Sequence, residues 1–347
     1  MAAIEIESLE KRFDHYEALS DINLAVAQGE FLTLLGPSGC GKTTLLKLIS
    51  GFLSPTKGTI RINGRDVTRV PPEVRDTALC FQSYALFPHL TVRENIEFGP
   101  RQKRMRAGDR DLRVAEVSEA LGLGPHMAKL PNQLSGGQQQ RVSLGRALAM
   151  RPSIILFDEP LSNLDAKLRD QVRIEIRRIV RDFGLTAIYV THDQAEALAM
   201  SDRVMVLNHG RVEQLAPPEM LYNRPRTRFV ADFIGGANLL DGTIDREAAP
   251  GLWRINTKAG SFEARLDRPP TGRQVTVCWR PEHARIESDG IEARVVHRTF
   301  QGAFTDLGLE AGGVSFRVQL QETSAQEGET IRIAVRPERV QVLEEPA

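Results

Sequence analysis

The 347-residue sequence has few cysteines, few aromatic residues and no net charge. Its three cysteines are scattered and odd in number, which disfavours a disulfide framework and indicates a reducing cytoplasm. Aromatic residues make up 6% of the chain, and 45 basic residues balance 45 acidic ones, so neither stacking platforms nor a basic field favours nucleic acid as a partner. No apolar run approaches the roughly twenty residues of a membrane span, and the first residues lack the pattern of a signal peptide. At this length two domains are expected.

The chain does contain a glycine-rich phosphate loop. An apolar strand is expected at residues 31–35 and a helix at 43–49, which is the context that such a loop requires. The motif G-x-x-x-x-G-K-[ST] is formed by Gly36, Pro37, Ser38, Gly39, Cys40, Gly41, Lys42 and Thr43. Glycines let backbone N–H groups approach phosphate oxygens, Lys42 reaches the terminal phosphates, and the Thr43 hydroxyl is suited to magnesium. We interpret Cys40 as a small residue that only fills space in the loop. The motif as a whole predicts a site for a nucleotide triphosphate with Mg²⁺.

A second glycine-rich motif, LSGGQQQR, occupies residues 134–141 and is expected to open a helix. One nucleotide triphosphate needs only one phosphate loop. We therefore interpret the second motif as a part of the site that another copy of the chain supplies, so that each nucleotide is held between two copies.

Acidic and basic side chains follow two buried strands that are expected at residues 154–157 and 186–190. Asp158 and Glu159 end the first strand, and His192 follows the second. Between them, apolar residues at spacings of three and four predict an amphipathic helix that ends at Gly184. Strand, helix and strand in this order predict a parallel sheet with functional residues at the carboxyl ends of its strands. Asp158 is placed to act on magnesium, and Glu159 to accept a proton from water that attacks the γ-phosphate.

The remaining segments differ in periodicity. Short strands are expected before residue 35, helices between about 88 and 152, and a hairpin around residues 204–212. After residue 236 helical periodicity nearly vanishes, which predicts a β domain. Residues 275–282 are similar to residues 331–338, so two related small barrels or half-barrels are expected to share one core; the alternative is two ordinary strands that each end in a turn.

In their order and spacing these motifs resemble the ATP-binding cassette (ABC) ATPases, the motor subunits of membrane transporters. The resemblance covers residues 4–235. It implies an α/β P-loop NTPase core with an N-terminal antiparallel β subdomain and a helical subdomain inserted at about 88–152. The part from 236 to 347 resembles the all-β, OB-like (TOBE-like) regulatory and dimer domain of bacterial importers.

The resemblance also implies a role for individual residues. Tyr16 lies where the adenine-stacking aromatic occurs, and Thr44 belongs to the nucleotide-binding loop. Gln82 would contact magnesium and sense the membrane partner, Glu159 would polarise the attacking water, and His192 would hold the γ-phosphate. In a head-to-tail homodimer, two segments of one copy would contact the ATP bound to the other. The first is the second glycine motif, the family's signature, with Ser135, Gly136, Gly137 and Gln138. The second is the D-loop at 161–165, with Asp165.

Further expectations concern partners. Residues 82–90 resemble the segment that receives a permease's coupling helix, with Tyr84 and Phe87 as docking residues, and a solute-binding protein would act indirectly. The location implied is the cytoplasmic face of the inner membrane. Residues 236–242 are similar to those of polyamine, ferric-iron and phosphonate importers. The alternative is a soluble ABC-type ATPase of DNA repair or translation. Three features argue against it: the chain has a single cassette, its net charge is zero, and it has no long heptad repeats.

Overall fold

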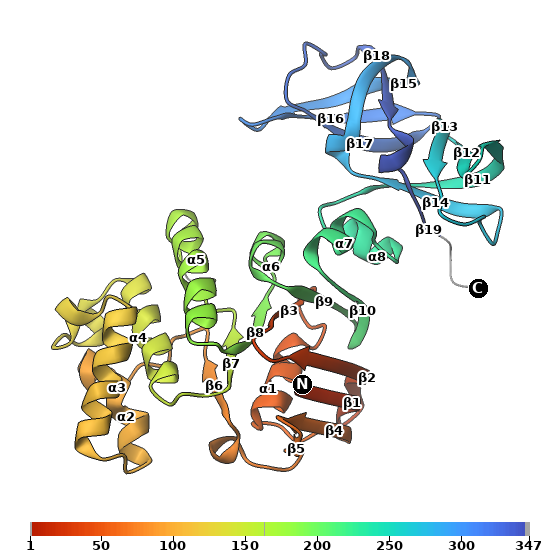
Figure 1. Cartoon of the computed structure of the whole chain (residues 1–347). Coiled ribbons are helices and arrows are strands. Elements are labelled where there is room, and N and C mark those ends of the chain that lie inside the picture. The colour runs from red at the N-terminus through yellow and green to blue at the C-terminus, as the bar shows by residue number, and fades with distance from the viewer. Residues whose placement is uncertain (1, 163, 344–347) are drawn as a thin grey trace. The chain divides into compact units, whose positions relative to one another are not determined.

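The computed structural model describes residues 2–162 and 164–343, which form two compact units, Met1–Pro218 and Glu219–Ala347 (Figure 1). Residues 219–235, which the sequence assigns to the first domain, pack with the second unit. The physical cause is Arg280, which is 3% exposed and whose guanidinium donates to the carbonyl oxygens of Tyr222, Ala231 and Ile234. A functional boundary after residue 235 stays a prediction.

An antiparallel sheet forms the start of the first unit, in the order β2-β1-β4-β5. Its strands are β1 (Ala2–Phe13), β2 (Tyr16–Ala27), β4 (Lys57–Ile62) and β5 (Arg65–Asp66). Alternating apolar residues of β2, among them Ile22, Leu24 and Val26, are buried, because side chains of a strand point to opposite faces in turn. Asp14 has a φ of 46° in the tight turn between β1 and β2.

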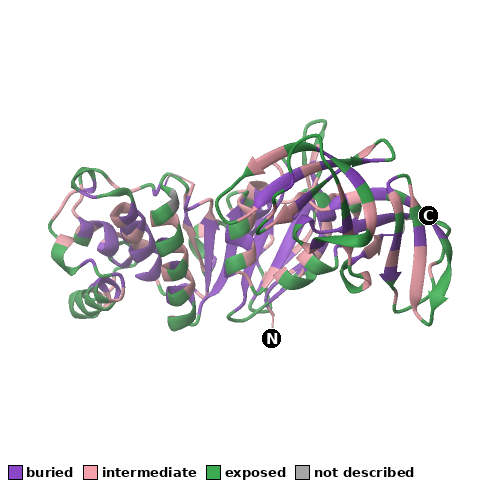
Figure 2. Ribbon diagram, turned by 90° about the horizontal axis from the view of Figure 1, so that it is seen from above, coloured by how far each residue is buried: buried purple, intermediate pink, exposed green. Residues whose placement is uncertain are grey.

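A mainly parallel sheet forms the centre of this unit, in the order β10-β9-β3-β8-β7-β6. The strands are β3 (Phe31–Leu35), β6 (Thr77–Cys80), β7 (Ile154–Asp158), β8 (Thr186–Thr191), β9 (Arg203–Asn208) and β10 (Arg211–Ala216). All residues of β3 and β8 are buried. Figure 2 shows strands whose residues are buried along much of their length, in purple. The pair β7–β8 is parallel, as predicted, and the pairs β3–β8 and β6–β7 are parallel as well. Strands β9 and β10 form the predicted hairpin.

Helices connect these strands. They are α1 (Lys42–Ser50), α5 (Ala166–Asp182) and α6 (Gln194–Met200). The predicted apolar stripe of α5 is confirmed, since Val172, Ile176 and Val180 are at most 3% exposed. After α5 the chain turns at Gly184, whose φ of 62° is a left-handed conformation that favours glycine.

The inserted helical part consists of α2 (Val92–Gln102), α3 (Ala107–Ala120) and α4 (Gly136–Leu148), with short 3-10 turns at Gly124–His126 and Pro131–Gln133. A capping box between Thr91 and Glu94 starts α2. Val117 of α3 and Val142 of α4 are fully buried in the same core as Ile155 of the parallel sheet. The helices therefore extend the core of the first unit.

The second unit begins with α7 (Pro218–Asn223) and α8 (Arg228–Phe233) and continues as two antiparallel sheets. One has the order β13-β12-β11-β14-β19 and the other β17-β16-β15-β18, and both contribute to one core. The strands are β11 (Asn238–Ala249), β12 (Leu252–Thr257), β13 (Gly260–Arg265), β14 (Gln274–Trp279), β15 (Ala284–Phe300), β16 (Thr305–Ala311), β17 (Val314–Leu320), β18 (Thr330–Val335) and β19 (Gln341–Leu343).

The two similar segments of this unit have the same local structure. Strand β14 leads into a 3-10 turn at Pro281–His283, and β18 leads into one at Pro337–Arg339. The strands lie in different sheets that share a core, as the sequence similarity predicts. Throughout the described parts of the chain, we find no helix with the length and apolar character needed to cross a bilayer.

Candidate nucleotide site

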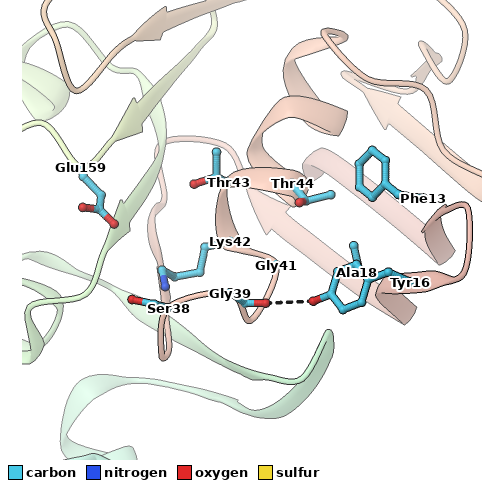
Figure 3. Close-up of a pocket in the computed structure, with 10 residues that line it drawn as sticks. All are labelled: Phe13, Tyr16, Ala18, Ser38, Gly39, Gly41, Lys42, Thr43, Thr44 and Glu159. Atoms are coloured by element: carbon cyan, nitrogen blue, oxygen red, sulfur yellow. Dashed lines mark hydrogen bonds between the residues drawn. The ribbon is translucent and has the colours of Figure 1, made fainter.

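The phosphate loop borders a cavity of about 350 Å³ in the first unit (Figure 3). The loop connects β3 to α1, so that the cavity lies at the carboxyl end of a parallel strand and the amino end of a helix, where backbone N–H groups favour anions. The residues that line it are Phe13, Tyr16, Ala18, Ser38, Gly39, Gly41, Lys42, Thr43, Thr44 and Glu159.

Three glycines of the loop are needed for different reasons. Gly39 and Gly41 have φ values of 79° and 105°, which residues with a Cβ rarely adopt. Gly36 is required for packing, because a Cβ there would lie 2.2 Å from the carbonyl oxygen of Leu207. The space beside Gly39 is open, with nothing within 4 Å of a Cβ at that position. The loop thus leaves room for phosphate oxygens on the cavity side.

Lys42 brings a buried positive charge to this loop. The residue is 6% exposed, and its Nζ donates to the carbonyl oxygens of Gly36 at 2.7 Å and Pro37 at 2.9 Å. The Sγ of Cys40, a buried residue, lies 3.8 Å from the same Nζ. A buried ammonium needs compensating partners, and the carbonyls supply them within the loop. This arrangement suits a ligand with phosphate groups.

The other end of the cavity is aromatic. Tyr16 is 57% exposed, and its hydroxyl donates to the carbonyl oxygen of Gly39 at 3.2 Å, the contact drawn in Figure 3. Phe13 is 41% exposed and pairs with Tyr16 across β1 and β2. Sequence reasoning missed Phe13, although its position directly before a turn was a signal. Two exposed rings beside a phosphate loop suit a nucleobase.

Oxygen atoms suited to a cation lie on the facing strand. The Thr43 hydroxyl donates to Oδ1 of Asp158 at 3.2 Å. Burial raises the pKa of the Asp158 carboxyl, and the charge of Glu159 adds to the rise, whereas the bond from Thr43 lowers it. Within residues 2–162 and 164–343 no group of three or more His, Cys, Asp or Glu side chains gathers as a metal site. One carboxylate and one hydroxyl fit Mg²⁺, which commonly keeps waters and phosphate oxygens as its other ligands.

Glu159 and His192 are brought together although they end different strands. His192 Nδ1 lies 3.1 Å from Oε2 of Glu159. The backbone of Glu159 has a φ of 46°, an uncommon conformation for a residue with a side chain, and its N–H donates to the carbonyl oxygen of Val190. The carboxylate and the imidazole thus meet beside the cavity, which Glu159 also lines.

The second glycine motif lies elsewhere. Ser135 and Gly136 are exposed, and residues 135–138, all of them described, are not among those that line the cavity. Ser135 caps α4, with its Oγ accepting from the Gln138 N–H at 3.4 Å and the Gln138 side chain accepting from the Ser135 N–H at 3.0 Å. Figure 1 shows α4 in the helical part of the first unit, away from α1.

Comparisons with known proteins agree with this geometry. The ABC transporter family matches residues 19–162, and the TOBE domain family matches residues 277–343. The chain is 45% identical to the spermidine/putrescine import ATP-binding protein PotA of Thermobifida fusca, over 98% of this chain and 93% of that protein. The PotA protein of Rubrobacter xylanophilus is 44% identical over 96% of this chain and 91% of its own length. The chain belongs to the ABC transporter family.

A solved structure supports the same assignment. The structure of cbiO1 from Clostridium perfringens, described as part of the ABC transporter complex cbiONQ, aligns with a TM-score of 0.60 and 26% identity. The aligned region covers 63% of this chain and 90% of the cbiO1 chain. The chain is thus the ATP-hydrolysing subunit of an ABC transporter, with the expected α/β core and all-β C-terminal part. These relatives give no support to a soluble ATPase of DNA repair or translation.

In this ABC ATPase, Gln82 and Asp165 lie outside the cavity lining. The Gln82 side chain donates to the hydroxyl of Ser162 at 3.2 Å, next to the turn that follows Glu159. Asp165 caps α5, with Oδ1 accepting from the Leu168 N–H at 3.0 Å. Asn163 of the predicted D-loop lies outside the described residues.

The structure corrects the expectation for Tyr84. Its side chain is 7% exposed, so it offers no surface to a partner. Its carbonyl oxygen accepts from the Ser143 hydroxyl at 3.0 Å, and Arg146 donates to the carbonyl oxygens of Tyr84 and Ala85. Both Tyr84 and Ala85 have positive φ values, of 59° and 47°. Phe87 is partly buried, and the centroid of its ring lies 4.3 Å from the ring centroid of Phe98.

Proposed function

We propose that two copies of this chain hydrolyse ATP between them and thereby drive import of a polyamine of the spermidine/putrescine class through a separate membrane permease. The observation that carries the substrate class is the match to spermidine/putrescine import proteins across both units, at 45% identity over 98% of the chain. This match favours the polyamine class over the ferric-iron and phosphonate classes, which the sequence left open.

The homodimer is supported by the separation of the two glycine motifs. The cavity contains groups for base and phosphates from one chain, while Ser135 and Gly136 are exposed on α4. In the proposed head-to-tail pair, the amino end of α4, capped by Ser135, faces the nucleotide of the other copy, with Gly137 and Gln138 beside it. Helix amino ends favour phosphate.

The proposed reaction assigns a role to each residue of the cavity. Tyr16 and Phe13 hold the base, and the loop from Gly36 to Thr43, with Thr44 after it, holds the phosphates. Mg²⁺, when bound, neutralises charge on the phosphate oxygens, and Thr43, Asp158 and Gln82 are the residues that would hold it. Glu159 orients the attacking water and accepts its proton. His192 donates a hydrogen bond to the γ-phosphate, and its contact with Glu159 keeps both groups beside one another.

The permease is proposed to dock on residues 82–90, with the chain peripheral to the cytoplasmic face of the membrane. Since Tyr84 is buried, the proposed docking surface includes the exposed residues Ser83, Ala85, Pro88 and His89 and the partly buried Phe87. This segment begins with Gln82, whose side chain donates to the hydroxyl of Ser162 in the turn after Glu159. A movement of the docked permease would therefore change the position of Glu159. A solute-binding protein would act through the permease only.

The test is substrate-dependent ATPase activity of the assembled complex. The tagged chain is purified from detergent-solubilised membranes together with its permease, reconstituted in nanodiscs and mixed with the solute-binding protein. We expect spermidine or putrescine to stimulate hydrolysis, and ferric iron and 2-aminoethylphosphonate to leave it at the basal rate. Stimulation by one of the latter solutes would refute the polyamine assignment. Recovery of the chain without any membrane protein, with full activity, would refute the transporter role.

A further inference from the structure

A buried carboxylate lies behind the loop that carries His192. Glu196 is 4% exposed, and its Oε2 accepts from the hydroxyls of Tyr189 at 2.9 Å and Thr191 at 2.7 Å. Burial, and next the negative charge of Glu196, raise the pKa of Tyr189 well above its ordinary value, so that the phenol stays a donor. The other oxygen, Oε1, lies 3.9 Å from Nε of Arg169. A buried charge needs a counter-ion, and Arg169 provides it.

Asp193, the residue after His192, divides its oxygens in a similar way. Oδ1 caps α6 by accepting from the N–H groups of Ala195 at 2.8 Å and Glu196 at 3.1 Å. Oδ2 accepts from Nη1 of Arg169 at 3.4 Å. The Asp193 N–H in turn donates to the Thr191 hydroxyl at 2.9 Å. The residues on both sides of His192 are thus anchored, and both anchors lead to Arg169.

The same guanidinium also contacts the turn between β7 and α5. Arg169 Nη2 donates to the carbonyl oxygen of Leu164 at 3.1 Å, and Leu164 directly precedes Asp165. A cavity of about 40 Å³, enough for a water molecule, is lined by Arg169 together with Glu159 and His192. The Nε of Arg169 is buried and makes no hydrogen bond with the described residues. The guanidinium therefore has room and a spare donor with which to shift toward either side.

We propose that Arg169 is a positioning residue for hydrolysis. It holds His192 against Glu159 through Asp193 and Glu196, and it transmits a movement of the Asp165 turn to that pair. The inference rests on the proposed roles of Glu159 and His192. The family resemblance implies that Asp165 contacts the second copy, so Arg169 would couple the position of Glu159 and His192 to the presence of that copy.

The test compares Arg169→Gln with Arg169→Lys and with a matched control, Arg173→Gln. Arg173 lies on the same helix one turn later and forms an ion pair with the exposed Asp170, at 3.1 Å. Steady-state ATPase activity of the full chain is measured with Mg²⁺ and ATP, at a temperature where thermal denaturation shows each variant to be folded. We expect Arg169→Gln to lower kcat by about 10–100-fold, the usual effect of a misplaced catalytic group, with KM nearly unchanged.

Arg169→Lys keeps the charge beside Glu196 but cannot reach both carboxylates and Leu164, so we expect an intermediate kcat. Arg173→Gln should hydrolyse ATP as the wild type does. An unchanged kcat for Arg169→Gln, or a loss that appears only where the protein unfolds, would overturn the inference.

A second readout separates positioning from a general structural effect. If Arg169 acts through His192, the double variant Arg169→Gln/His192→Ala should be no slower than His192→Ala alone, because residues that act as a unit are not additive. Fully additive losses would contradict the inference. The proposed function fails separately, if the wild-type chain shows no Mg²⁺-dependent hydrolysis at all.

Discussion

The two glycine-rich motifs of the first unit differ in what their glycines do. In the phosphate loop, Gly39 and Gly41 supply positive φ values, and Lys42 is buried inside the loop. In the second motif the glycines are helical. A Cβ at Gly136 would lie 3.3 Å from the side chain of Leu164. The first motif thus lines a cavity of its own chain, whereas Ser135 and Gly136 of the second are exposed and lie outside that cavity.

This contrast has a consequence for mutation. Changes around the first motif should alter the binding of ATP by a single chain or the hydrolytic step itself, and changes in the second motif should alter only the pairing of two chains.

Glu159→Gln should slow hydrolysis by about 10²–10⁴-fold, the usual contribution of a general base. ATP binding should persist, because the amide keeps the size of the side chain and the phosphate loop is unchanged. Single-turnover hydrolysis and nucleotide titration measure the two properties separately. A variant that hydrolyses ATP at the wild-type rate would show that Glu159 is not the base.

Ser135→Arg should abolish ATP-driven pairing while the affinity of a single chain for ATP stays within about twofold, since the residue is outside the cavity. Ser135→Ala is the matched control. It removes the cap of α4, at a cost of about 1 kcal/mol of stability, but places no charge at the partner's phosphates. If titration showed that Ser135→Arg loses monomer affinity to the extent that it loses pairing, the second motif would serve its own chain.

Tyr16→Ala should weaken ATP binding by about fivefold to tenfold, since stacking of a base on one aromatic ring contributes about 1–3 kcal/mol and Phe13 remains. Phe13→Ala should have a similar or smaller effect. Titration with ATP and with inorganic triphosphate distinguishes the base from the phosphates, because only ATP should bind less tightly. Equal weakening for both ligands would place Tyr16 at the phosphates.

Most of the fold follows from local patterns. The apolar strands at 154–157 and 186–190, the stripe of α5 and the glycine loop each predict their element, because burial of one face dictates the spacing of apolar residues. The meeting of Glu159 and His192 also follows, since parallel strands present their carboxyl ends at one edge.

Other features depend on contacts between distant segments. Tyr84 is buried because Ser143 and Arg146, on α4, bind the carbonyl of a backbone with positive φ, and nothing in the local sequence predicts those partners. Arg280 and Arg336 occupy equivalent positions in the repeated segments, yet Arg280 is buried against residues 222–234 while Arg336 is exposed. Arg169 has the charge and position of a solvated helix face in the sequence, and only its carboxylate partners reveal another role.

The central claim is that ATP is held between two copies of the chain. The most direct measurement is the molar mass of Glu159→Gln by light scattering, with and without Mg²⁺ and saturating ATP. We predict a monomer that becomes a dimer on adding ATP, and a monomer under both conditions when Ser135→Arg is added to the same chain. A Glu159→Gln protein that titration shows to be saturated with ATP, but that remains monomeric at every concentration, would contradict the account.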